Sequence, residues 1–160
     1  MKSIDKKIRH VEKKKPNTIR VAYYRGYKKT ADDNLKSLLP KDEHDIQAVE
    51  KWNRFAIDGI KPTVPDLLVW LQDLNWPVAQ PIALFLLNFI DEITNEILKI
   101  LQTDDEVWKY NLIHVFGENI NDAKLKKEII RLAKFPTDSE KSEEIDLISK
   151  KIIQKWNTEK

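Results

Sequence analysis

The sequence lacks cysteine, has little glycine and contains no long apolar run. None of its 160 residues is cysteine, which excludes a disulfide scaffold, a thiolate zinc site and a cysteine nucleophile. Its three glycines, Gly26, Gly59 and Gly117, lie too far apart for the glycine-rich nucleotide-binding motifs. The longest unbroken apolar run, Ile82–Leu87, is far below the roughly 18 residues of a membrane helix. We therefore expect no membrane association, no secretory signal and a cytoplasmic location.

The charged residues are distributed unevenly along the chain. Hydrophobic residues make up 41% and charged residues 34%, with a net charge of +2. The first 34 residues hold eleven Lys or Arg and four acidic residues, a net charge of +7, while the other 126 hold 17 basic and 22 acidic residues, a net charge of −5. This contrast predicts a basic N-terminal arm, residues 1–33, attached to a helical domain, residues 34–160. A basic arm either binds nucleic acid or an acidic protein, or is simply a solvated tail.

Hydrophobic periodicity predicts an all-α fold beyond the arm. Within the arm, Ile4–Val11 has the spacing of a short helix and Ile19–Tyr27 alternates like an extended segment. The stretch Val78–Ile90 has almost no polar face, which predicts a central helix. Capping patterns mark further helix boundaries. The predicted starts are Asp42 (with Asp45), Thr63, Asp104 and Thr137 (with Glu140), and the predicted stops are Gly59 and Gly117.

An internal repeat relates Asp66–Leu87 to Glu96–Gly117 with an offset of thirty residues. Each copy reads as a helix, a three-residue turn with an Asp or Asn cap, and a second helix. Repeats of this length are typical of α-solenoids, so we expect a short HEAT-like superhelix of antiparallel helix pairs, with a generic helical bundle as the alternative. The alignment predicts six buried positions: Leu71, Ile82, Leu86, Leu101, Leu112 and Phe116.

Four strings resemble a bacterial family known as domain of unknown function 5071. They are LLPKDEHD (Leu38–Asp45), WLQDLNWPVAQPIA (Trp70–Ala83), DDEVWKY (Asp104–Tyr110) and PTDSEKSEEID (Pro136–Asp146). The resemblance covers roughly Leu35 to Ile153. It implies a small HEAT-like helical domain and no particular activity.

No group of residues predicts catalysis. His10, His44 and His114 have no distinctive serine motif beside them, and the acids around His44 read as helix caps rather than metal ligands. We therefore predict that the chain is not an enzyme and that it has no catalytic residues, no metal site and no cofactor.

Candidate partner-binding residues form two sets. The first set consists of two tryptophans and neighbouring acidic residues: Trp76, Trp108, Asp73, Asp104 and Asp105. The tryptophans either pack between the repeats or, together with the acidic residues, form a partner-binding rim. The second lies in the arm and either packs on the helical body or binds nucleic acid: Tyr23, Tyr24, Arg25, Tyr27, Lys28 and Lys29. We expect a non-catalytic protein-interaction module, with nucleic-acid association through the arm, or neutralisation of a toxin as an immunity protein, as alternatives.

Overall fold

The structure is a computed structural model that describes residues 33–52 and 55–158, in which every regular element is helical. This confirms the all-α prediction for the described residues. The predictions for the arm, including its six candidate binding residues, lie outside the described residues.

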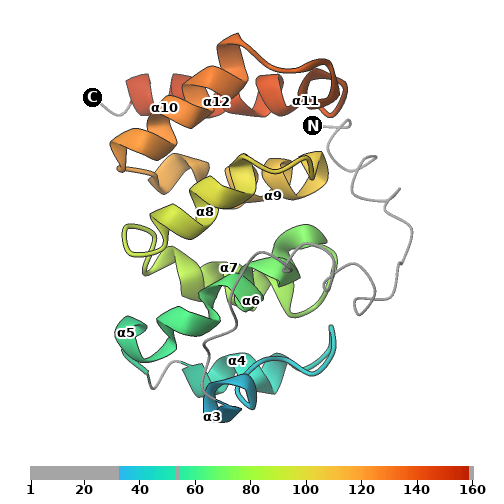
Figure 1. The fold of residues 1–160 in the computed structure, drawn as a ribbon, viewed down its shortest axis with the longest axis vertical. Coiled ribbons are helices and arrows are strands. Elements are labelled where there is room, and N and C mark those ends of the chain that lie inside the picture. The colour runs from blue at the N-terminus through green and yellow to red at the C-terminus, as the bar shows by residue number, and fades with distance from the viewer. Residues whose placement is uncertain (1–32, 53–54, 159–160) are drawn as a thin grey trace. The chain divides into compact units, whose positions relative to one another are not determined.

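Figure 1 shows the helices of the described residues. They are α3 (Asp33–Lys36), α4 (Ile46–Trp52), α5 (Ile57–Ile60), the 3-10 helix η2 (Lys61–Thr63), α6 (Val64–Val69), the 3-10 helix η3 (Trp70–Gln72), α7 (Ala79–Leu87), α8 (Thr94–Leu101), α9 (Glu106–Phe116), the 3-10 helix η4 (Gly117–Asn119), α10 (Ala123–Lys134), α11 (Asp138–Ser142) and α12 (Ile145–Thr158).

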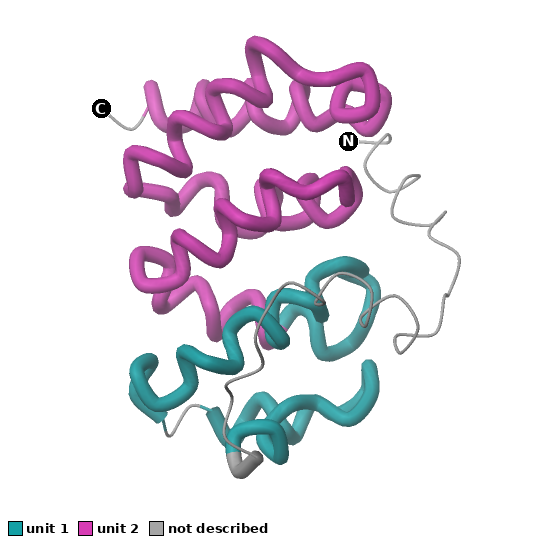
Figure 2. Tube along the Cα trace, viewed as in Figure 1, with its two compact units in different colours: residues 1–80 teal, residues 81–160 magenta. Residues whose placement is uncertain are grey.

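The chain divides into two compact units at residues 80 and 81 (Figure 2). Unit 1 contains α3 to η3 and the first two residues of α7, and unit 2 contains the rest. Among the described residues no helix has both the length and the apolar composition needed to cross a membrane.

Unit 1 is built from short helices around an aromatic and aliphatic core. Trp52 is buried at the end of α4, where its indole N–H donates a hydrogen bond of 2.8 Å to the Leu38 carbonyl. Leu67, Leu68 and Leu71 are fully buried along α6 and η3. Pro65 lies in the first turn of α6, where its missing N–H costs no helix hydrogen bond. Apolar burial therefore holds this unit together.

The start of α7 shows the effect of two prolines. The predicted central helix begins at Ala79, so that Pro77 precedes it and Pro81 falls in its first turn. A first-turn N–H has no intrahelical partner, and the helix therefore accepts Pro81 there. Ile82 and Leu86 are fully buried, but Leu84 is 58% exposed, so the helix is not enclosed on every side as its composition suggests.

Unit 2 consists of longer helices packed on α12. Helix α12 packs against α9, α10 and α11, and α8 packs against α9 and α10. Figure 1 shows α10 lying beside α12. Gly117 directly follows α9, as predicted for a helix stop, and is the first residue of η4. Its φ of −51° is right-handed, so this position requires glycine for close packing and not for a left-handed conformation. A Cβ at this position would lie 2.8 Å from Ile152 Cγ1.

The six positions predicted to be buried are all fully buried. Several helix boundaries differ from the sequence prediction. Gly59 does not end a helix but lies within α5, because α4 already stops at Trp52. Thr63 precedes α6 without a side-chain cap, since its hydroxyl donates instead to the Ile60 carbonyl at 2.6 Å. The connection between α8 and α9 has four residues, Gln102 to Asp105, and not three.

Candidate functional site

Two loops of unit 1, residues 41–45 and 73–78, lie side by side and are called the linked loops below. The backbone N–H of Val78 donates a hydrogen bond of 3.1 Å to the Glu43 carbonyl, which joins them. Two of the strings that carry the family resemblance therefore meet at one place. Together the loops carry four carboxylates, those of Asp42, Glu43, Asp45 and Asp73, and a single lysine, Lys41.

Each loop is held in shape by an aspartate that accepts backbone hydrogen bonds. Asp42 accepts from the His44 N–H at 2.9 Å, and Asp73 accepts from the Asn75 N–H at 2.9 Å. Asp45 accepts from the Ala48 N–H at 3.3 Å, so Asp45, and not the predicted Asp42, caps α4. These turns fix the loop backbones and place the carboxylates at the surface.

Trp76 is the aromatic residue of the linked loops. It is half-buried and makes an edge-to-face contact with the buried Trp70, with ring centroids 5.6 Å apart. This contact anchors one part of the ring and leaves the rest accessible. The predicted pair Trp76 and Asp73 is therefore brought together on one acidic surface.

The other predicted partner-binding residues lie in unit 2 at the start of α9. Trp108 is only 3% exposed, so its side chain packs in the interior and is not accessible to a partner at the surface. The carboxylate of Asp105, and not that of the predicted Asp104, caps the helix by accepting from the Trp108 N–H at 3.0 Å. Burial raises the pKa of Asp105 although this hydrogen bond opposes the change. Asp104 is exposed.

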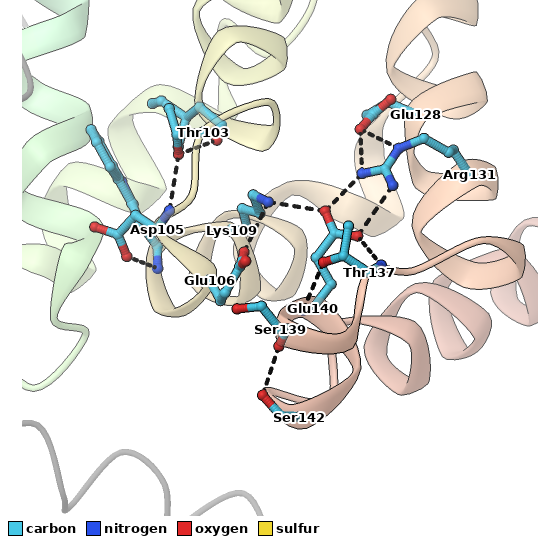
Figure 3. Close-up of polar contacts among 12 residues, drawn as sticks. Thr103, Asp105, Glu106, Lys109, Glu128, Arg131, Thr137, Ser139, Glu140 and Ser142 are labelled. Atoms are coloured by element: carbon cyan, nitrogen blue, oxygen red, sulfur yellow. Dashed lines mark hydrogen bonds and ion pairs between the residues drawn. The ribbon is translucent and has the colours of Figure 1, made fainter.

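Unit 2 contains a largely buried charge cluster that was not predicted from the sequence, formed by Glu106, Lys109, Glu128, Arg131 and Glu140 (Figure 3). Lys109 Nζ lies 2.8 Å from Glu106 Oε2 and 3.0 Å from Glu140 Oε1. The side chains of Lys109 and Glu140 are only 4% and 3% exposed. The cluster thus ties α9, α10 and α11 together. Lys109 and Glu140 are withdrawn from solvent, whereas the side chain of Arg131 is 36% exposed.

Glu140 has two functions in this cluster. Its Oε2 accepts from the Thr137 N–H at 2.8 Å, completing the predicted capping box of α11, and Arg131 donates to both of its oxygens at 2.8 and 3.1 Å. Burial alone would raise the pKa of Glu140, but the hydrogen bonds from Arg131, Thr137 and Lys109 lower it from 4.5 to about 2. Burial would lower the pKa of Lys109, and its bonds to Glu106 and Glu140 raise it instead.

The capping box was the only local sequence signal for this cluster. Lys109 and Glu140 are 31 residues apart, and no short motif links them. Each charged side chain of the cluster lies within ion-pair distance of an opposite charge, which favours a structural role. Among the described residues no group of His, Cys, Asp and Glu has the arrangement of a metal site.

The described residues thus form an all-helical fold with the acidic linked loops at the surface of unit 1. The family model described as domain of unknown function (DUF5071) matches residues 38–153. The chain belongs to this family. Comparison with curated proteins gives no match.

Proposed function

We propose that the chain is a non-catalytic protein-interaction module that binds a basic segment of a partner protein at the linked loops. One observation carries the proposal: a half-buried tryptophan, Trp76, lies on a pair of acidic loops that a backbone hydrogen bond joins. A tryptophan anchored on one side supplies apolar contact at little entropic cost. The surrounding carboxylates attract lysine and arginine and disfavour acidic partners.

We also propose that the helix pairs are HEAT-like repeats, as the internal repeat suggests. Helices α6 and α8 begin thirty residues apart, at Val64 and Thr94. The aligned pairs Leu71 and Leu101, Ile82 and Leu112, and Leu86 and Phe116 are equally buried. Solenoids of this kind present surfaces for protein partners. We extend the proposal to a cytoplasmic location, which a sequence without cysteine fits.

The test is affinity purification of the tagged full-length chain from its own host, with nuclease treatment to separate protein partners from nucleic acid. Trp76→Ala removes the proposed anchor, and Phe135→Ala is its control because Phe135 is an aromatic residue 74% exposed in unit 2. We expect a nuclease-resistant protein partner that W76A loses and F135A retains. No such partner, or equal retention by both variants, would contradict the proposal.

A second variant pair tests the charge of the linked loops. D42N/E43Q removes two carboxylate charges, and the amide oxygen that D42N introduces can still accept the turn hydrogen bond. Its control, E50Q/D58N, removes two exposed charges elsewhere in unit 1. We expect only D42N/E43Q to weaken binding. The captured protein also decides the immunity alternative, since a toxin as partner would make the chain its neutralising protein.

A further inference from the structure

Helices α10 and α12 carry eight lysines or arginines and only two acidic residues. Both acids are already paired within their own helices. Glu128 lies 2.8 Å from Arg131, and Asp146 lies 2.6 Å from Lys150. The acids therefore do not offset the remaining lysines of the two helices.

Five of these lysines have no ion-pair partner among the described residues. They are Lys124, Lys126, Lys127, Lys134 and Lys151. Lys124, Lys127 and Lys134 share a stripe with Arg131, at spacings of three, four and three residues. Lys126 lies outside this stripe and contacts α12, and Lys151 belongs to α12 itself.

Aromatic rings lie among these cations. Lys126 Nζ of α10 is 5.4 Å from the centroid of the Trp156 ring of α12, a cation–π contact. The Trp156 indole N–H donates to the Gly117 carbonyl at 2.9 Å, which fixes the ring. The ring is half-buried and so keeps an accessible part.

Helix α9 extends the same surface with a second pair of rings. Tyr110 and His114 are nearly parallel, with an interplanar angle of 12° and centroids 6.5 Å apart. Burial, followed by the charges of Lys151 and Lys155, lowers the pKa of His114, although Glu118 opposes them. Glu118 forms an ion pair with Lys155.

These residues form what we call the basic–aromatic strip: Tyr110, His114, Lys126, Lys151, Lys155 and Trp156. We propose that the basic–aromatic strip binds single-stranded nucleic acid, with Lys126 and Lys151 on phosphates and its rings against unpaired bases. Such binding combines a cationic track with aromatic stacking faces. An acidic polypeptide would use the lysines alone, whereas the strip offers rings as well. The strip shares no residue with the linked loops, and this proposal does not rest on the proposed function.

The charge component is tested by fluorescence anisotropy of the full-length protein with a fluorescein-labelled single-stranded RNA of 12 nucleotides. K126Q/K151Q removes two strip cations, and K41Q/K61Q removes two exposed cations of unit 1 as a matched control. Every protein also carries K13Q/K14Q/K15Q, which lowers the contribution of the basic arm. We expect K126Q/K151Q alone to weaken binding on the order of tenfold and to reduce the slope of log K against log salt by about 1.4.

The stacking component is tested with an abasic strand of the same phosphate count and with poly-glutamate of the same charge. We expect RNA to bind roughly fivefold or more tightly than the abasic strand or poly-glutamate. His114→Ala should reduce this difference in affinity. Equal binding of all three would overturn the proposal in favour of an acidic protein partner. Equal losses in K126Q/K151Q and K41Q/K61Q, or no binding of RNA by the parent protein in 50 mM salt, would also overturn it.

Discussion

In unit 1 the aspartates of the linked loops accept hydrogen bonds from backbone N–H groups. In the described part of unit 2, Asp105 and Asp122 do the same, but five other acidic side chains pair with lysine or arginine. An aspartate that accepts from the backbone keeps its negative charge at the surface. An acid paired with a cation is neutralised. The same types of residue therefore leave an acidic surface on the linked loops and a basic one on α10 and α12.

The units also differ in what stabilises them. The buried groups of α6 and η3 in unit 1 are apolar apart from the indole N–H of Trp70, whereas unit 2 buries Lys109 and Glu140 between helices. Apolar burial tolerates small changes in packing, but a buried ion pair depends on both partners. The units should thus respond differently to substitution and to pH.

The largest expected effect is from Glu140→Ala in unit 2. This change leaves Lys109 buried with one carboxylate partner fewer and also removes the capping box. Breaking a buried pair costs about 3–5 kcal/mol of unfolding free energy. Urea unfolding at pH 7 measures it, with the exposed neighbour variant Lys141→Ala as control, expected within about 0.5 kcal/mol of the parent. A loss below about 1 kcal/mol for E140A would show that the cluster is not what holds α11.

The aligned leucines of the repeat should be equivalent across the two units. Leu71→Ala and Leu101→Ala each remove a fully buried side chain, and each should cost about 2–5 kcal/mol. Leu84→Ala, at a position 58% exposed, is the control and should cost far less. Thermal and urea unfolding compare the three variants. A large cost at one leucine and almost none at the other would reject the alignment.

Acid should weaken unit 2 through Glu140. Because its pKa is about 2 in the folded protein and 4.5 ordinarily, the unfolded state takes up the proton first as pH falls. The stability from Glu140 is therefore complete above about pH 5 and is lost between roughly pH 4.5 and 2, by about 3 kcal/mol at most. The unfolding free energies of the parent and Glu140→Gln should converge over this range. A difference that stays constant from pH 7 to pH 3 would contradict the assignment.

Alanine substitutions at two glycines should have smaller effects on stability, and these effects should differ in sign. A methyl group at Gly117 in unit 2 would clash with Ile152, so Gly117→Ala should cost about 1–3 kcal/mol. Gly59 in α5 has nothing within 4 Å of an added Cβ, so Gly59→Ala should be neutral or stabilise by up to about 1 kcal/mol. Melting temperatures of the two variants give the comparison, and a shift of the same sign in both would refute it.

The sequence predicted the helical fold, the six buried positions and the Thr137–Glu140 capping box, because periodicity and capping are local properties. It misplaced the cap of α9 by one residue, since Asp104 and Asp105 are equally suited to capping and only the packed helix distinguishes them. It placed Trp76 and Asp73 in one candidate set, but not the contact of their loop with residues 41–45. That contact and the Lys109–Glu140 pair join distant segments, so no local pattern could show them.

The most direct test of the account is whether the two surfaces bind opposite charges independently. Full-length ¹⁵N-labelled protein is titrated with a lysine- and arginine-rich peptide and, separately, with single-stranded RNA, and amide shifts are followed by NMR. We expect the peptide to shift residues 41–45 and 73–78, and RNA to shift α9, α10 and α12 around the basic–aromatic strip. If both ligands shift the same residues, or the peptide leaves the linked loops unchanged, the assignment of two separate binding surfaces is wrong.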